Sequence, residues 1–246
     1  MNFLYITDQN KVFMKSVCII PARGGSKRIP RKNIKPFLGK PIIYYSIRAA
    51  LDTGMFDEVM VSTDDEEIAE VARSYGAVVP FFRSEKNADD YATVAHVLNE
   101  VLGEYKAVGR EFDYMCCIYP TAPFVTSERV GEAMKTLIDN DLEGVVPVLK
   151  FSFPVQRAVR INDVGYLYMP TPEHYNTRSQ DLEPTYHDSG SFYCLEIKSF
   201  LEQQILYPKK AMPLVLKESE VQDIDTLEDW QVAEFKMEFF KQQKEE

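Results

Sequence analysis

The fold follows from the stretch SVCIIPARGGSK, residues 16–27. Residues 16–20 form a short apolar run that ends at Pro21, which is the pattern of a buried strand. Gly24 and Gly25 then allow a sharp backbone turn with consecutive N–H groups exposed, and Arg23 and Lys27 stand beside them. Such a nest of amides next to cationic side chains predicts a site for a polyanion.

Strand-like and helix-like segments alternate after this stretch. The predicted strands are 58–62, 77–79, 114–119, 144–149, 191–197 and 214–216, and the predicted helices are 41–51, 65–75, 91–106, 127–140 and a last one from about Thr226. Ser127 is the candidate N-cap of the fourth helix, and Thr226 with Asp229 has capping-box character at the start of the last. Short connections favour a mostly parallel sheet that helices cover on both faces. The predicted fold class is therefore α/β, doubly wound, with ligands at the carboxyl ends of the strands.

Residues 150–190 break the alternation. They are rich in Pro, aromatic and polar residues, and they are too long for a simple loop. We predict an inserted subdomain that serves as a lid or as a dimerisation contact. The predicted organisation is one domain over 14–246 with this insertion, preceded by an extension, 1–13, to which no function is assigned.

The composition excludes several classes of protein. With 246 residues, 45% hydrophobic and 27% charged, the chain is neither collagen-like nor disordered. No apolar run approaches the roughly 20 residues that span a bilayer, and no signal-peptide pattern is present, so we expect no membrane partner. Four cysteines without C-x-x-C spacing are interpreted as core thiols, which suit a reducing cytoplasm.

Charge is distributed unevenly. The net charge of −10 argues against nucleic acid as a partner. Residues 22–40 are an exception to this acidic character, because they contain no Asp or Glu. Their basic residues are Arg23, Lys27, Arg28, Arg31, Lys32, Lys35 and Lys40. A solvated loop is one interpretation, and a cradle for a triphosphate or pyrophosphate is the other. The spacing matches neither G-x-x-x-x-G-K-[ST] nor G-x-G-x-x-G.

The stretch RGGSKRIPRKN, residues 23–33, resembles the signature of the nonulosonic acid cytidylyltransferases, the enzymes that make CMP-sialic acids. The similarity continues in GKPIIYYS (39–46), VSTDDEEIA (61–69), RSE (83–85), PTAP (120–123) and VQDIDT (221–226). Segments 118–123, 151–158, 176–184 and 186–188 are most similar to the branch of the family that activates pseudaminic acid. Tyr119 stands where the sialic acid branch has a glutamine that helps to hold the sugar, which argues against N-acetylneuraminate.

This resemblance implies a Rossmann-like nucleotidyltransferase fold and a reaction. CMP passes from CTP to the anomeric hydroxyl of pseudaminic acid, an acidic nine-carbon sugar, and pyrophosphate is released. It also implies Mg²⁺ as the cofactor and a cytoplasmic homodimer that the insertion builds. Synthesis of CMP-N-acetylneuraminate or CMP-legionaminate is the alternative within the family. A non-catalytic nucleotide- or sugar-binding protein is the alternative of another class.

The resemblance also assigns residues to the nucleotide. Catalytic roles fall to Arg23, Lys32 and Asp225. The predicted nucleotide-binding residues are Ala22, Arg23, Gly24, Gly25, Ser26, Lys27, Asn33, Thr63, Asp64, Arg83 and Ser84. Arginine suits bidentate contact with phosphate, whereas lysine acts as a point charge, and Lys32 is placed to meet the leaving pyrophosphate. Arg31 is interpreted as a solvated neighbour of this cradle.

Asp223 and Asp225 form a D-x-D pair. Residues i and i+2 of an extended segment face the same side, so both carboxylates can converge on one ion. Mg²⁺ keeps several waters and takes one or two carboxylates besides phosphate oxygens. A D-x-D pair alone is more often a turn or an N-cap, and Asp225 precedes a predicted helix. The resemblance favours the metal.

For the sugar, the predicted residues are Arg178, Gln180 and Asp181, with Tyr186, Phe192 and Tyr193 as apolar walls. An arginine fork grips the carboxylate that these sugars carry. Core packing is the alternative interpretation of the three aromatic residues.

Overall fold

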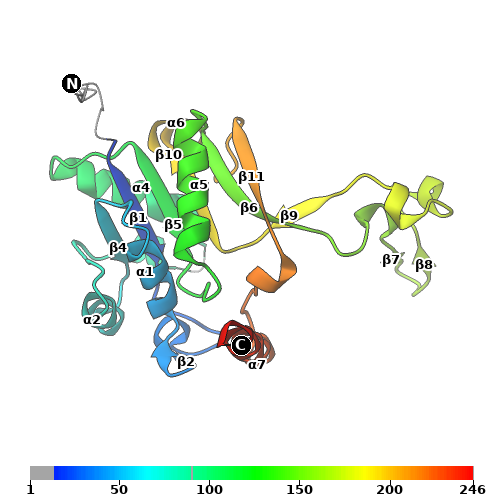
Figure 1. Cartoon of the computed structure of the whole chain (residues 1–246), viewed down its shortest axis with the longest axis horizontal. Coiled ribbons are helices and arrows are strands. Elements are labelled where there is room, and N and C mark those ends of the chain that lie inside the picture. The colour runs from blue at the N-terminus through cyan, green and yellow to red at the C-terminus, as the bar shows by residue number, and fades with distance from the viewer. Residues whose placement is uncertain (1–13, 90, 246) are drawn as a thin grey trace, which may run out of the picture.

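A computed structural model describes residues 14–89 and 91–245, and the predicted extension 1–13 lies outside them. Seven strands form the central sheet, in the order β11-β6-β10-β5-β1-β4, with β9 beside β6 (Figure 1). They are β1 (Ser16–Pro21), β4 (Glu58–Ser62), β5 (Tyr114–Ile118), β6 (Gly144–Lys150), β9 (Tyr186–Asp188), β10 (Phe192–Glu196) and β11 (Ala211–Leu216). Strand β1 therefore lies inside the sheet, with a neighbour on each side.

Five of the seven strands run in one direction, although only three of the six strand pairings are parallel. Strand β1 pairs in parallel with both β4 and β5, and β11 pairs in parallel with β6. Strand β10 is antiparallel to β5 and β6, and β9 is antiparallel to β6. The predicted α/β class with a mostly parallel sheet is confirmed. The antiparallel pair arises where the chain returns to the sheet after the insertion.

Helices cover both faces of this sheet. They are α1 (Ile43–Leu51), α2 (Glu66–Ser74), α3 (Glu85–Ala88), α4 (Val94–Ala107), α5 (Ser127–Asp139), α6 (Ile197–Gln203) and α7 (Leu227–Glu245). Cys18 and Ile20 of β1 pack in the same core cluster as α1, α2 and α5, whereas Val17 and Ile19 pack with α4 and α6. Alternate side chains thus enter two cores, which is why the strand is apolar throughout.

A third, smaller core joins the two ends of the chain. Phe37 belongs to a short hairpin of β2 (Pro36–Phe37) and β3 (Lys40–Pro41), and its ring meets that of Trp230 of α7 edge-on at 5.5 Å between centroids. Ile29 and Ile224 are buried in the same cluster. The loop after β1 and the segment before α7 are therefore held against each other by apolar packing.

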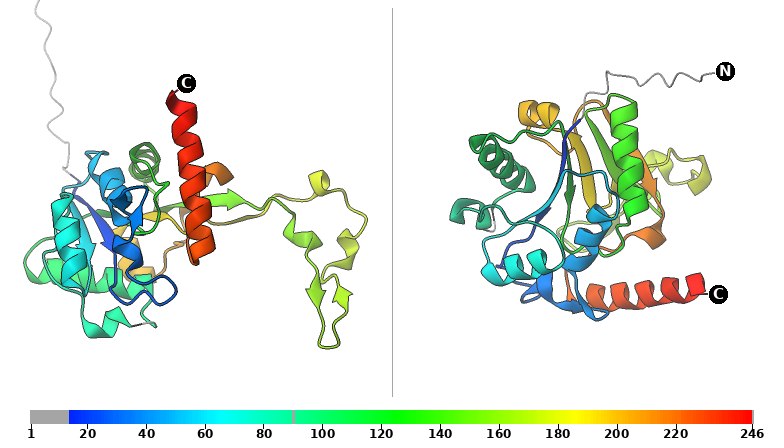
Figure 2. Two further views of the ribbon diagram at one scale, coloured as in Figure 1. Left: turned by 90° about the horizontal axis from the view of Figure 1, so that it is seen from below. Right: turned by 60° about the vertical axis from the view of Figure 1, so that its left-hand side comes forward.

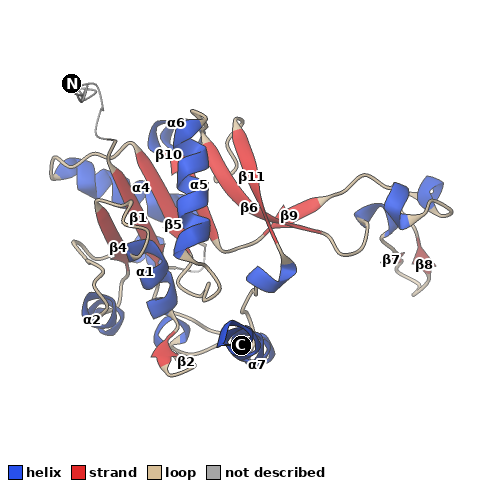
Figure 3. Cartoon of the chain, viewed as in Figure 1, coloured by secondary structure: helices blue, strands red, loops and turns tan. Residues whose placement is uncertain are grey.

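The insertion leaves the sheet after β6 and returns through β9. Figures 1 and 2 show it as an arm that projects from the body, and Figure 3 shows that it holds only short elements. These are η2 (Val155–Arg157), β7 (Arg160–Ile161), β8 (Leu167–Tyr168), η3 (Pro172–His174) and η4 (Ser179–Asp181). Its apolar side chains are exposed, Phe153 by 85% and Tyr166 by 72%. Its role as a lid or a dimer contact stays a prediction.

Several details of the sequence-based assignment need correction. The predicted strand 77–79 is a single parallel bridge between Met60 and Val78, because Pro80 follows at once. Thr126, not Ser127, caps α5, since its side chain accepts from the amide of Arg129. Helices α3 and α6 were not predicted at all.

The interpretation of the cysteines as core thiols is confirmed. The four cysteines are free thiols buried in the core. Within the described ranges, no helix has the length and apolar character needed to cross a membrane.

Candidate active site

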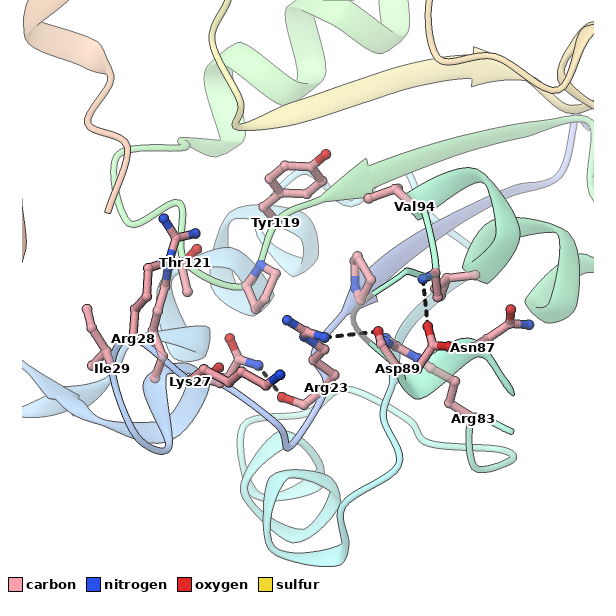
Figure 4. A pocket seen from close by; sticks show the side chains of 17 residues that line it. Arg23, Lys27, Arg28, Ile29, Arg83, Asn87, Asp89, Val94, Tyr119 and Thr121 are labelled. Atoms are coloured by element: carbon pink, nitrogen blue, oxygen red, sulfur yellow. Dashed lines mark hydrogen bonds between the residues drawn. The ribbon is translucent and has the colours of Figure 1, made fainter. Parts of the chain in front are cut away.

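A pocket of about 480 Å³ opens where β1 and β5 end (Figure 4). The residues that line it come from the loop after β1, from the segment around α3, from α4 and from the turn after β5. They are Pro21, Arg23, Ser26, Lys27, Arg28, Ile29, Lys32, Asn33, Arg83, Asn87, Asp89, Ala92, Val94, Val97, Tyr119, Pro120 and Thr121. The pocket lies at the carboxyl ends of parallel strands, where the α/β rule places ligands.

The glycine turn is packed against the loop that follows β4. The amide of Gly24 donates to Asp64 Oδ1 at 2.8 Å, so one N–H of the predicted nest already has a carboxylate partner. A Cβ atom at Gly24 would lie 2.8 Å from Asp65 Oδ2, whereas one at Gly25 would meet nothing within 4 Å. Gly24 is therefore required by close packing, and Gly25 faces open space.

Arg23 and Asn33 are tied to the backbone around the pocket. Arg23 Nη1 donates to the carbonyl of Asp89 at 2.9 Å, and Asn33 Nδ2 donates to the carbonyl of Arg23 at 2.8 Å (Figure 4). Asn33 is buried, so its amide holds the two ends of the loop together from inside. Its predicted contact with the nucleotide stays a prediction.

Arg83 is buried, with 7% of its surface exposed, beneath the pocket. Its Nη2 donates to the carbonyl of Ser62 at 2.6 Å and its Nε to Ser62 Oγ at 3.1 Å. Burial lowers the pKa of Arg83 to about 10, against the opposing effect of Asp64 and Glu100. Arg83 therefore stays protonated at neutral pH and supplies a fixed positive charge.

Thr63 and Ser84 are held in the same region. Thr63 is fully buried, and its Oγ1 accepts from the amide of Asp65 at 3.2 Å. Ser84 donates from its amide and its hydroxyl to Glu100, at 2.6 and 2.8 Å. The structure thus brings Thr63, Asp64, Arg83 and Ser84 together beside the glycine turn, although of these four only Arg83 lines the pocket.

The D-x-D pair lies next to the basic loop. Asp225 Oδ1 is 2.8 Å from Arg28 Nη2 and 3.7 Å from Lys32 Nζ, and Lys32 also donates to the carbonyl of Ile224. Burial lowers the pKa of Lys32, against the opposing effect of Asp225 and Asp223. Two segments that are 192 residues apart thereby form one cluster of alternating charge.

A capping box holds the backbone of this pair. Asp229 Oδ2 accepts from the amides of Asp225 and Thr226, at 3.1 and 2.7 Å, and Thr226 Oγ1 accepts from the amide of Asp229 at 3.2 Å. The predicted capping box of the last helix is confirmed. Asp225 is therefore not the cap itself, and its carboxylate is directed to the basic loop.

The two carboxylates suit a hard cation in an open site. In residues 14–89 and 91–245, no group of three or more His, Cys, Asp or Glu side chains is arranged to hold an ion. Asp223 is exposed, and the Asp225 side chain is 40% exposed although its Oδ1 pairs with Arg28, so both carboxylates are accessible to water. This donor set fits Mg²⁺, which keeps waters and shares phosphate oxygens, and does not fit a closed zinc site.

A comparison with known families decides the assignment. The family model for cytidylyltransferases matches residues 17–243. The chain belongs to the cytidylyltransferase family. A pseudaminic acid cytidylyltransferase of Campylobacter jejuni is 44% identical over 220 residues, which are 89% of this chain and 95% of that protein. A CMP-N,N'-diacetyllegionaminic acid synthase of Legionella pneumophila is 36% identical over 232 residues, 92% and 97% of the two chains.

A solved structure has the same fold. It is a CMP:2-keto-3-deoxy-manno-octonic acid synthetase complexed with CTP, with a TM-score of 0.66 at 18% identity, over 91% of this chain and 98% of that one. The predicted fold and the predicted membership of a cytidylyltransferase family are both confirmed, and the chain is a nucleotidyltransferase.

For a cytidylyltransferase, the predicted sugar-binding residues lie in unexpected places. Arg178, Gln180 and Asp181 sit on the projecting arm, where Arg178 Nε is 2.7 Å from Asp181 Oδ2 and the arginine side chain is 71% exposed. Tyr186 is on β9 and 45% exposed. None of these four lines the pocket of its own chain.

Phe192 and Tyr193 are core residues of this cytidylyltransferase. They point to opposite faces of β10, and each belongs to a different apolar cluster. Core packing, the alternative interpretation, describes Phe192 fully. Tyr193 has a second contact, because its hydroxyl donates to Asp188 at the base of the arm.

Sequence reasoning missed part of the cytidylyltransferase pocket. Asn87 and Asp89 line it, and Tyr119 forms its wall opposite Arg23 (Figure 4). Burial raises the pKa of Tyr119 to about 12. Its ring lies 5.8 Å from that of Tyr193. The sequence singled out Tyr119, the last residue of the predicted strand 114–119, only as the replacement of a glutamine.

The charge cluster leads to a test on Lys32. We expect Asp225→Asn to lower the pKa of Lys32 further, because the carboxylate that favours the charged amine is lost while burial remains. Titration of the Lys32 side chain by NMR measures this. Glu228→Gln removes an exposed acid from the first turn of α7 and serves as the control. An unchanged or raised pKa in Asp225→Asn would show that the two groups do not interact.

Proposed function

We propose that this cytidylyltransferase transfers CMP from CTP to the anomeric hydroxyl of pseudaminic acid and releases pyrophosphate. One observation carries the choice of sugar, namely the 44% identity to the Campylobacter jejuni pseudaminic acid cytidylyltransferase over 95% of that protein. Tyr119 supports the choice, because it replaces the glutamine that the sialic acid branch uses for its sugar and lies in the wall of the pocket.

The basic loop supplies what the transfer needs at the phosphates. The sugar hydroxyl attacks the α-phosphorus, the bond to the bridging oxygen breaks, and pyrophosphate leaves. Such a step depends on positioning and charge neutralisation rather than on a covalent intermediate. We assign contacts with the triphosphate to Arg23, Ser26, Lys27 and the Gly24–Gly25 turn, and contact with the leaving pyrophosphate to Lys32.

Residues beside the glycine turn form the proposed nucleoside side of the site. We assign ribose and cytosine to the region of Ala22, Asn33, Thr63, Asp64, Arg83 and Ser84. The support is that Ala22, Asn33, Thr63 and Asp64 lie on the loops after β1 and β4, and that Arg83, directly before α3, holds a charge beside the pocket. A preorganised buried charge needs no reorientation when the substrate arrives.

Mg²⁺ is the proposed cofactor, held by Asp223 and Asp225. When bound, Mg²⁺ neutralises phosphate charge and lowers the pKa of a nearby hydroxyl. In the structure Asp225 is shared between Arg28 and Lys32, so the same carboxylate orients the loop that grips the phosphates. We assign Asp225 as the residue closest to the reacting hydroxyl.

The arm is the proposed source of the sugar contacts and of a homodimer. We assign the Arg178 guanidinium to a bidentate contact with the sugar carboxylate. Gln180, Asp181 and Tyr186 are the proposed neighbouring contacts, and Tyr193 of β10 is a proposed apolar contact. Because the arm projects from its own body, we propose that it reaches the pocket of a partner subunit. Exposed Phe153, Ile161 and Tyr166 support burial in such a contact. The buried free thiols support a cytoplasmic location.

The substrate assignment is tested by pyrophosphate release from CTP. With Mg²⁺ present, we expect release with pseudaminic acid and a kcat/KM at least about tenfold lower with legionaminic and N-acetylneuraminic acids, because a pocket built for other hydroxyl and amide positions leaves polar groups unpaired. Release only with N-acetylneuraminic acid would reassign the sugar, and no release with any of the three would defeat the proposal.

The metal assignment is tested by substitution of the pair. We expect Asp223→Asn and Asp225→Asn to lower activity and raise the Mg²⁺ concentration for half-maximal rate by at least about tenfold, as loss of groups around metal sites does. Glu228→Gln is the matched control, since it neutralises a nearby acid outside the pair. An Asp225→Asn enzyme that keeps most of its turnover would rule out this role.

The dimer is tested by sedimentation velocity. We expect the wild type to sediment as a dimer, and Phe153→Asp to yield a folded, inactive monomer, since a charge cannot be buried at an apolar contact without a partner. Val108→Asp, at an equally open position after α4, is the control and should remain dimeric. A fully active wild-type monomer contradicts the proposal.

A further inference from the structure

Arg31 is not the solvated neighbour that the sequence suggested. Its Nη1 lies 2.5 Å from Asp65 Oδ2 and its Nη2 lies 2.9 Å from Asp65 Oδ1, and Nη2 also contacts Glu67. The contact with Asp65 is a two-pronged fork, the geometry in which an arginine–carboxylate pair is strongest and most directional. The two side chains are 39% and 22% exposed, so water screens the pair only in part.

Asp65 connects this arginine to the glycine turn. It caps α2, because its Oδ1 accepts from the amide of Ile68 at 3.0 Å. Its other oxygen lies so close to Gly24 that a Cβ there would be 2.8 Å away. The neighbouring Asp64 accepts from the Gly24 amide at 2.8 Å. The position of Gly24 therefore depends on where Asp65 is held.

The backbone of Arg31 is in an unusual conformation. Its φ of 55° and ψ of 30° lie in the left-handed region, which costs free energy for a residue with a Cβ and none for glycine. The amides of Ile34 and Lys35 both donate to its carbonyl, so it begins the 3₁₀ turn η1 (Lys32–Ile34). A glycine would form this turn without strain, so the turn alone does not account for an arginine.

Arg31 and Lys32 are adjacent but contact different parts of the molecule. Arg31 binds the start of α2, whereas Lys32 binds Ile224 and Asp225, directly before α7. The two helices lie apart in Figure 1. The loop after β1 is thus held at two neighbouring residues by two elements, and the left-handed turn at Arg31 directs the two side chains to them.

We infer that Arg31 is a positioning residue for nucleotide binding: through Asp65 it anchors the loop of residues 22–33 to the start of α2, which keeps the Gly24 turn and Lys32 in place for the phosphates. Arg31 does not line the pocket, so it acts through Asp65 and makes no contact with the substrate itself. This inference rests on the proposed nucleotide site.

The test is a double-mutant cycle on CTP binding. Calorimetry with CTP and Mg²⁺ gives the Kd of wild type, Arg31→Ala, Asp65→Asn and the double variant. We expect each single change to raise the Kd about tenfold, which is typical of connected sites. The double variant should be no weaker than the worse single one, because both changes break one contact. In turnover assays the KM for CTP should rise while the KM for the sugar stays constant.

Two further variants separate the contact from fold stability. Arg31→Gly relieves the strained backbone and removes the side chain, so its melting temperature should match or exceed that of wild type while its Kd rises as in Arg31→Ala. Arg73→Ala is the control. It removes an arginine–glutamate pair on α2, in which Arg73 Nη1 lies 3.0 Å from Glu66 Oε1 and the arginine side chain is 43% exposed, and it should leave the Kd for CTP unchanged.

Three outcomes would overturn the inference. Additive effects in the double variant would mean that Arg31 and Asp65 act separately. An unchanged Kd in Arg31→Ala would mean that the anchor has no role. Wild-type affinity in Arg31→Gly would mean that only the backbone turn matters. The proposed function fails separately. If wild type binds CTP but transfers CMP to no acidic sugar, the sugar assignment is wrong and the cycle on CTP binding still decides the role of Arg31.

Discussion

Strand β1 pairs in parallel with β4 on one side and β5 on the other, and this pairing brings the loops after the three strands to one edge of the sheet. Three parts of the candidate site follow from that juxtaposition. The glycine turn after β1 rests on Asp64 and Asp65 after β4, and Tyr119 after β5 closes the opposite wall. The loop after β1 lies between the other two because the three parallel strands end at the same edge of the sheet.

Charge balance in the site is distributed over several segments. The loop of residues 22–40 has an excess of cations, and its acidic partners come from elsewhere: Asp65 and Glu67 from the start of α2 for Arg31, and Asp225 from the segment before α7 for Arg28 and Lys32. These ion pairs hold the basic side chains of the loop in fixed directions and reduce the repulsion between them. The loop is thereby preorganised, so little rearrangement is needed when an anion arrives.

Much of the fold was predictable because its signals are local. The apolar runs at 16–20, 58–62 and 144–149 and the capping box at Thr226 give strands and a helix start within a residue or two. The antiparallel β10 was not predictable, because side-chain periodicity is the same in both strand directions. The role of Arg31 was missed because its partner Asp65 is 34 residues away in the sequence. A basic residue among other basic residues is expected to be solvated when no acidic partner is near it in the sequence. Residues 150–190 were predicted to form an insertion, whereas the distance of the arm from the pocket is a property of three-dimensional placement alone.

The third core has a consequence for biosynthesis. Ile29 and Phe37, near the start of the chain, are covered by Ile224 and Trp230, near its end, and Lys32 finds its carbonyl partner only there. Contacts of such sequence separation form late, because the loop-closure entropy must first be offset. A chain emerging from the ribosome therefore has its sheet edge and glycine turn long before it has a complete cradle. The segment before α7 thus completes the basic loop, because Ile224 and Asp225 are the partners of Lys32 and Arg28.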